Sequence, residues 1–196
     1  MVTDIRRGSE KIMSEKKNKL AVVFPGMGYH PDKPLLYYSA KLASAAGYEI
    51  VKVIYPPCEA VDKEHMLPYV EECIRAAEHA IDGIDLFGQE DILFLSKSIG
   101  TVAATALAQS RKIAARQVLF TPLAETFIHA GQGCGIAFSG TKDQWVDHAK
   151  VRELCARKDI PMTAIVNGNH SLETGDALRD IETLQKVMQE VSAYIC

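Results

Sequence analysis

The stretch Asp91–Ala108, with the sequence DILFLSKSIGTVAATALA, decides the fold predicted for this chain. A short apolar run at Ile92–Leu95 predicts a strand, and the alanine-rich segment after Gly100 predicts a helix. Between them, the small residues around Ser98 are typical of a nucleophile elbow, a tight strand-to-helix turn that exposes one serine hydroxyl. Ser96 stands where the usual motif has its first glycine, and Gly100 keeps the second. Ser98 is therefore the candidate nucleophile.

Other interpretations of this turn stay open. A serine in such a segment can merely accept a hydrogen bond from a backbone N–H at the start of a helix. Ser96 could itself be the nucleophile, but it belongs to the strand end, where its hydroxyl would lack the exposure of the elbow. Lys97 is expected in local polar contacts or at the rim of a pocket. A serine–lysine mechanism is conceivable, but the sequence has no partner motif for it.

The length and composition suit one globular domain. The chain has 196 residues, of which 47% are hydrophobic and 24% are charged. These are ordinary values, and the length allows a full core but not two well-formed domains with a linker. We expect residues 1–19, with their interleaved charges, to form an N-terminal extension and residues 20–196 to form the domain.

The charge and cysteine content argue against several classes of partner. The net charge is −3 and the sequence pI is about 6.1, which argues against nucleic acid and against a polybasic membrane anchor. No apolar run approaches the roughly 18 residues that cross a bilayer. The five cysteines are odd in number and lack metal-ligand spacing, so a cytoplasmic location and the absence of a metal or other cofactor are expected. The expected partner is a small-molecule substrate, and the chain could also form a homo-oligomer.

Apolar runs and helical periodicity alternate along the chain. Strands are expected at Leu20–Phe24, Ile50–Tyr55, Ile92–Leu95, Val118–Phe120, Gly135–Ser139 and Met162–Val166. Besides the helix after the elbow, helices are expected at Leu35–Ala46, Met66–Ile81, Val146–Arg157 and Leu178–Ile195. Continuous apolar strands joined by helices indicate an α/β fold with a doubly wound, mostly parallel sheet and helices on both faces. Ligands of such sheets bind at the carboxyl ends of the strands.

A glycine-rich turn follows the first strand, at Pro25–His30. It could begin a dinucleotide-binding fingerprint, but Pro31 stands where that motif needs a small residue. Glu49, the acid about 20 residues further on, also precedes the second strand instead of ending it. The segment could also be a simple structural turn. In the preferred interpretation, the Met27 N–H of this turn and the Ile99 N–H after the candidate nucleophile form an oxyanion hole.

An acid and a histidine follow the last two expected strands. Asp143 comes shortly after Gly135–Ser139, and His170 follows Met162–Val166 in a turn rich in glycine and asparagine. With Ser98 they stand in the order serine, acid, histidine, which is the order of this triad on an α/β sheet. The imidazole is needed because a serine hydroxyl is a weak nucleophile at neutral pH, and the carboxylate fixes the imidazole tautomer.

Asp147 and His30 are two further candidates for this site. Asp147 is the fallback acid, but it lies four residues further along, in the next helical stretch, and would have to reach back. His30 lies near the candidate oxyanion turn and is expected either in the pocket or on the surface.

The chain resembles the α/β-hydrolase superfamily from Leu20 to its end, on the motifs FPGMGYH, LFLSKSIGT, FSGTKDQW and VNGNHSLE. It looks most like small members without a cap domain, related to dienelactone hydrolase. The resemblance implies Ser98 as nucleophile, Asp143 as acid and His170 as base, with the same two N–H groups as oxyanion donors.

The sequence departs from the superfamily pattern at three points. Ser96 replaces the first glycine of the elbow, and Pro25 stands where many members have histidine. The chain before Leu20 is too short for the antiparallel hairpin that usually opens the sheet, which predicts a reduced sheet of about six strands.

The segment in which larger members insert a lid is short in this chain. Only Thr121–Cys134 lies there, which cannot build a cap domain. The resemblance therefore implies a shallow site that is open to solvent. Its expected walls are Tyr29, Thr121, Leu123 and Trp145.

Three functions follow from this sequence. The preferred one is a serine hydrolase that cleaves a small carboxylic ester or thioester through an acyl-Ser98 intermediate. The second is hydrolysis of a peptide-like amide or a C–C bond on the same triad, since fold alone does not fix the reaction. The third is a binding protein that retains the fold without catalysis.

Overall fold

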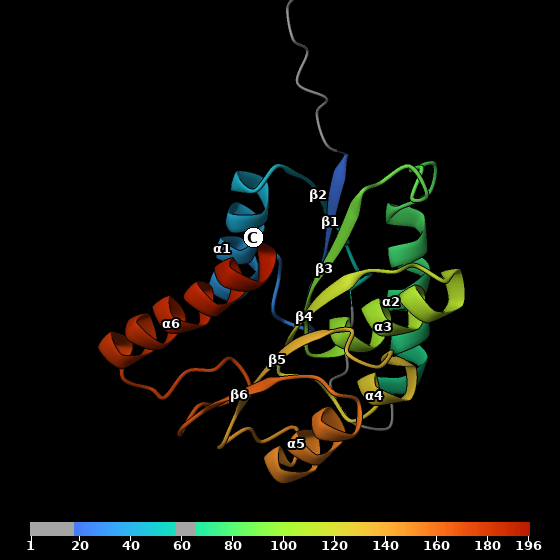
Figure 1. Cartoon of the computed structure of the whole chain (residues 1–196). Coiled ribbons are helices and arrows are strands. Elements are labelled where there is room, and N and C mark those ends of the chain that lie inside the picture. Colours follow the sequence, from blue (N-terminus) through green and yellow to red (C-terminus); the bar gives the residue numbers. More distant parts are fainter. Residues whose placement is uncertain (1–17, 58–65) are drawn as a thin grey trace, which may run out of the picture.

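The computed structural model describes residues 18–57 and 66–196, in which one parallel sheet lies between two layers of helices (Figure 1). The strands are β1 (Lys19–Phe24), β2 (Tyr48–Lys52), β3 (Asp91–Lys97), β4 (Arg116–Phe120), β5 (Gly135–Gly140) and β6 (Met162–Ile165). Their order across the sheet is β2-β1-β3-β4-β5-β6, and every neighbouring pair is parallel. The predicted doubly wound sheet of six strands is confirmed.

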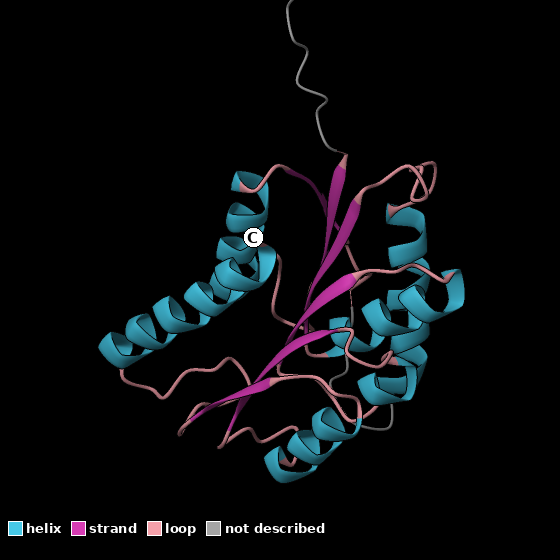
Figure 2. Cartoon of the chain, in the orientation of Figure 1, coloured by secondary structure: helices cyan, strands magenta, loops and turns pink. Residues whose placement is uncertain are grey.

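Helices cover both faces of this sheet (Figure 2). One face carries α1 (Pro34–Ala45) and α6 (Ala177–Ile195), and the other carries α2 (Met66–Ala80), α3 (Ile99–Arg111), α4 (Thr126–His129) and α5 (His148–Arg157). The segment between β4 and β5 contains only the short helix α4, so no cap domain lies there.

Side chains alternate between the two faces along each strand. Ile92 and Phe94 of β3 belong to the core under α2 and α3, whereas Leu93 and Leu95 belong to the core under α1 and α6. All four are at most 7% exposed. The central strands are therefore buried on both faces, which explains their continuous apolar sequence.

The expected elements agree with the structure except at some boundaries. The second strand spans Tyr48–Lys52 instead of Ile50–Tyr55, and α4 was not expected. The helix expected from Val146 begins at His148, because the Asp147 side chain accepts a hydrogen bond from Ala149 N at 2.9 Å and caps it. Of the expected N-terminal extension, residues 1–17 lie outside the described residues. Within the described part, no helix combines the length and hydropathy needed to span a bilayer.

Candidate active site

The turn between β3 and α3 holds Ser98 in a strained backbone conformation, with φ 55° and ψ −124°. The chain reverses sharply there, and a Cβ on Gly100 would overlap the backbone oxygens of Phe24 and Pro25. Only glycine fits at that close approach, which explains the small residue two positions after Ser98. The Ser96 side chain instead turns inward, is fully buried and donates to Val118 O at 3.1 Å. The structure thus favours Ser98 over Ser96 as the exposed hydroxyl.

His170 bridges Ser98 and Asp143. Its Nε2 lies 2.7 Å from Ser98 Oγ, and its Nδ1 lies 2.7 Å from Asp143 Oδ2. The side chain of Asp143 is 0% exposed and that of His170 is 19% exposed. The three side chains come from positions up to 72 residues apart and form one hydrogen-bonded chain at the carboxyl edge of the sheet.

Local contacts hold the two loops that carry Asp143 and His170 together. Lys142 N donates to Gly168 O at 2.9 Å, and Asn167 N donates to Thr141 Oγ1 at 2.8 Å. Asp143 Oδ1 accepts from Trp145 N at 2.8 Å, which fixes the carboxylate with its other oxygen toward the imidazole.

The electrostatics of the site favour a neutral imidazole. Burial lowers the pKa of His170 below its usual value, and the positive charge of Lys97 acts in the same direction. The hydrogen bond to Asp143 opposes this change without reversing it. A neutral imidazole that donates from Nδ1 to a carboxylate can accept the proton of a serine hydroxyl at Nε2.

The turn at Gly26–Tyr29 lies against the elbow. Gly26 N donates to Tyr29 O at 3.0 Å, and Tyr29 N donates to Gly26 O at 3.1 Å, with Gly28 at φ 65°. This pairing leaves the N–H of Met27 outside the turn's own two hydrogen bonds. Ile99 is the first residue of α3, where N–H groups lack partners within the helix. Both candidate oxyanion donors therefore lie on elements that adjoin Ser98.

The expected wall residues fall into two groups. Trp145 is 40% exposed, and its ring centroid lies 6.0 Å from that of His170, so it stands at the mouth of the site. Thr121 and Leu123 are 0% and 4% exposed. Leu123 packs in the core cluster that contains Ile99, and Thr121 adopts a positive φ of 45°.

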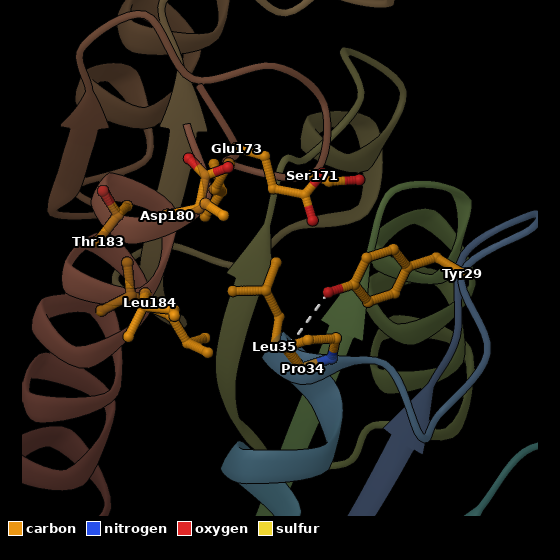
Figure 3. A pocket seen from close by; sticks show the side chains of 12 residues that line it. Tyr29, Pro34, Leu35, Ser171, Glu173, Asp180, Thr183 and Leu184 are labelled. Atoms are coloured by element: carbon orange, nitrogen blue, oxygen red, sulfur yellow. Dashed lines mark hydrogen bonds between the residues drawn. The ribbon is translucent and has the colours of Figure 1, made fainter. Parts of the chain in front are cut away.

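Tyr29 is buried and lines a cavity of about 290 Å³, which Ser171, the residue after His170, also lines (Figure 3). The cavity lies between the first turn of α1, the loop after His170 and the first half of α6. Apolar walls come from Leu35, Leu172, Ile181, Leu184 and Val187, and the carboxylates of Glu173 and Asp180 also line it.

Lys97, Asp147 and His30 lie in three different environments. Lys97, expected in polar contacts or at a pocket rim, is 1% exposed, and its ammonium lies 5.1 Å from the centre of the Tyr29 ring. The signal for this was the alternation along β3, which places Lys97 on the same face as Leu93 and Leu95. Asp147 caps α5 and therefore is not the acid beside His170. His30 is exposed. No cluster of metal-binding side chains occurs within residues 18–57 and 66–196.

Comparisons with known proteins agree with this architecture. No protein-family model and no curated protein matches the sequence. Among solved structures, the chain is similar to an α/β serine hydrolase without a lid from Xanthomonas campestris, with a TM-score of 0.63, 13% identity and coverage of 89% of this chain and 81% of that one. An α/β serine hydrolase homologue from Coxiella burnetii has a TM-score of 0.59 at 16% identity, covering 88% and 84% of the two chains.

A further similar structure is Est1E from Butyrivibrio proteoclasticus with ferulic acid bound, which has a TM-score of 0.58 at 11% identity and coverage of 91% and 92%. These likenesses extend over nearly the whole described sheet and its helices. The chain therefore has the α/β-hydrolase fold, in a form with six parallel strands and no cap domain between β4 and β5.

Proposed function

We propose that this protein is a serine hydrolase that cleaves a small carboxylic ester or thioester. The observation that carries the proposal is the position of His170, with one ring nitrogen 2.7 Å from Ser98 Oγ and the other 2.7 Å from Asp143 Oδ2. The similarity to serine hydrolases of the same fold supports it.

In the first half of the reaction, Ser98 Oγ attacks the carbonyl carbon while His170 Nε2 takes the hydroxyl proton. Asp143, held by Trp145 N, keeps the imidazole in the tautomer that leaves Nε2 free to accept. The negative charge that develops on the carbonyl oxygen is stabilised by the N–H groups of Met27 and Ile99.

The second half reverses these roles. The imidazolium returns its proton to the leaving alcohol or thiol as the bond to the carbonyl carbon breaks, which leaves an acyl-Ser98 ester. A water molecule then attacks that ester while His170 takes its proton, and the imidazolium passes this proton to Ser98 Oγ as the bond to the acyl group breaks and the acid is released. Throughout, the buried carboxylate of Asp143 stabilises the imidazolium without taking its proton.

The surroundings of Ser98 favour a small substrate. The segment between β4 and β5 builds no cap, and the loop after His170 lines a cavity of about 290 Å³ whose walls are mostly apolar. A cavity of this size suits a short acyl or alkyl group.

A fluorophosphonate probe tests the assignment, because it reacts covalently with activated serines. Wild-type protein should be labelled, Ser98→Ala should not, and Ser110→Ala, which removes an exposed serine from α3, should be labelled like wild type. Labelling that survives Ser98→Ala would overturn the proposal. With p-nitrophenyl esters, acyl thioesters and aminoacyl amides as substrates, turnover of amides alone would replace the ester assignment with the amide one.

A further inference from the structure

Lys97 is a buried cation that the proposed reaction does not use. It is the last residue of β3, directly before Ser98, and only 1% of it is exposed. Its side chain lies on the face of the sheet that α1 and α6 cover, among Leu95, Tyr29 and Phe120. A lysine at such a position is unusual, because burial disfavours its charged form.

The Lys97 side chain lies against the turn that presents the Met27 N–H. A Cβ on Gly26 would lie 3.3 Å from Lys97 Cγ and 3.3 Å from Ser98 Cβ. The turn and the elbow therefore touch through Lys97, and a side chain at position 26 would push them apart. Beyond that contact, Lys97 Nζ ends 5.1 Å from the centre of the Tyr29 ring.

Tyr29 is firmly placed at the other end of this contact. Its backbone closes the turn through two hydrogen bonds with Gly26, and its hydroxyl accepts from Leu35 N, at the start of α1, at 3.1 Å. A cation over an aromatic ring is attracted to the ring face, and more strongly where water is excluded. The Lys97–Tyr29 contact thus links the strand that carries the nucleophile to the turn beside it.

The charge on Lys97 depends on pH. In the described part of the chain, its ammonium has no ion-pair partner, and burial lowers its pKa to about 7. Asp143 and Glu173 favour the charged form at longer range, and Lys33, whose Nζ lies 5.2 Å from the same Tyr29 ring, disfavours it. His170 senses the charge in turn, since Lys97 contributes to its lowered pKa.

We infer that Lys97 is a positioning residue, whose ammonium on the Tyr29 ring fixes the Met27 turn against the Ser98 elbow. The inference rests on the proposed hydrolase reaction. Lys97 acts through Tyr29 and does not contact the substrate. A rigidly held oxyanion donor stabilises the transition state more than the bound substrate. Loss of the Lys97 ammonium should therefore lower kcat and leave KM nearly unchanged.

The inference predicts a distinctive pH profile. Below the pKa of His170 the base is protonated, which gives an acid limb. Above the pKa of Lys97 the ammonium is lost and the turn loosens, so kcat should fall again above about pH 7. The wild-type profile should therefore be bell-shaped.

The test compares wild type, Lys97→Met and Lys41→Met in hydrolysis of p-nitrophenyl acetate between about pH 5 and pH 9. Lys41 is the matched control, because its ammonium also lies over a tyrosine ring, that of Tyr37 at 5.7 Å, but on the exposed side of α1. Lys97→Met should lower kcat by about ten-fold or more with KM within about two-fold, and should abolish the alkaline limb. Its acid limb should move to higher pH, because removing the cation raises the pKa of His170.

A folded Lys97→Met protein with wild-type kcat and an unchanged pH profile would overturn the inference. A wild-type kcat that stays flat from about pH 7 to pH 9 would overturn it without any variant, so a failure of Lys97→Met to fold does not protect it. If wild type shows no turnover that depends on Ser98, it is the proposed function that fails, which is a different outcome.

Discussion

At the amino end of the sheet a hydrogen-bonded network joins Arg116, Asp91 and Tyr48, although the buried Gln117 Oε1 beside it lacks a hydrogen-bond partner within the described structure. At the carboxyl end the polar side chains around Ser98 include strained and unpaired ones. Arg116 on β4 and Asp91 on β3 form an ion pair at 2.6 Å, and Tyr48 on β2 donates to the same carboxylate at 2.5 Å. Arg116 also donates to the backbone oxygens of Tyr194 and Ile195, at 2.5 Å and 3.1 Å. This network connects the end of α6 to β2, β3 and β4.

The carboxyl end is built differently. Ser98 and Thr121 adopt positive φ angles of 55° and 45°, the Lys97 ammonium is buried without an ion-pair partner among the described residues, and the buried hydroxyl of Thr121 has no hydrogen-bond partner there either. Each of these features lowers stability, and strain of this kind gathers where a protein does chemistry. We interpret the network at the amino end as a contribution to stability and the strained and unpaired groups around Ser98 as part of the proposed active site.

His170→Ala tests this division with the largest expected effect. Loss of the base should lower kcat for p-nitrophenyl acetate by about 10⁴-fold, because a serine hydroxyl without a proton acceptor is a poor nucleophile. The melting temperature should fall slightly, because the buried Asp143 carboxylate loses the imidazole but keeps the Trp145 N–H. His79→Ala, on the exposed side of α2, is the control and should retain full activity. A His170→Ala protein with near-wild-type kcat would contradict the assignment of the carboxyl end to the proposed reaction.

Lys97→Met should stabilise the protein while it slows the reaction. The pKa of Lys97 is about 7 in the folded protein and 10.5 in the unfolded chain, so between these values the folded state binds fewer protons. The free energy of unfolding of wild type therefore rises with pH across that window, and the penalty of burying the charge is nearly complete at pH 7 and complete below it. Removing the lysine should raise the free energy of unfolding at pH 7 by about 4 kcal/mol.

The rise in the free energy of unfolding that Lys97→Met should cause depends on pH. It should shrink as pH rises from about 7 toward 9, because wild type itself loses the penalty there. Urea denaturation of wild type and Lys97→Met at both pH values measures the difference. A variant that is less stable than wild type at pH 7 would show that the lysine contributes to folding and would contradict the contrast between the two ends.

The sequence predicted the arrangement at the carboxyl end because that arrangement follows from local patterns. A strand, a small-residue turn and a helix marked Ser98, and the positions of Asp143 and His170 directly after parallel strands placed them at the same edge. Lys97 could have been placed by the alternation along β3, but a charged residue beside the nucleophile suggested a polar environment instead.

The amino-end network could not be predicted in this way. Asp91 and Arg116 meet only through the register of β3 with β4, in which Leu93 pairs with Arg116, and sequence patterns do not give a register. Thr121 and Leu123 were expected in the pocket wall because they follow a strand, and in the structure both are buried. The helix α4 was missed because four residues carry too little periodicity.

Arg116→Met tests the amino end, where we expect a loss of stability without a loss of activity. Methionine keeps most of the aliphatic stem but leaves the Asp91 carboxylate without its cation and frees the last carbonyls of α6. Because both side chains are partly exposed to solvent, we expect a loss of about 2 kcal/mol in the free energy of unfolding, with kcat unchanged. Denaturant unfolding and ester turnover on the same samples measure both quantities. A loss of activity without a loss of stability would reverse the roles assigned to the two ends.

Thr121→Val has the smallest expected effect and probes the carboxyl end alone. The Thr121 hydroxyl is fully buried and lacks a partner in the structure as described, so the folded state bears the loss of its hydrogen bonds to water. Valine has nearly the same shape, keeps the branched side chain at φ 45° and removes only that hydroxyl. The free energy of unfolding should therefore rise by about 1 kcal/mol in urea titrations at pH 7.

Ser39→Ala is the control, because the buried Ser39 hydroxyl donates to Leu35 O at 2.6 Å and its loss should lower stability. If Thr121→Val also lowers stability, the hydroxyl has a partner in solution, and the carboxyl end is less strained than its geometry indicates.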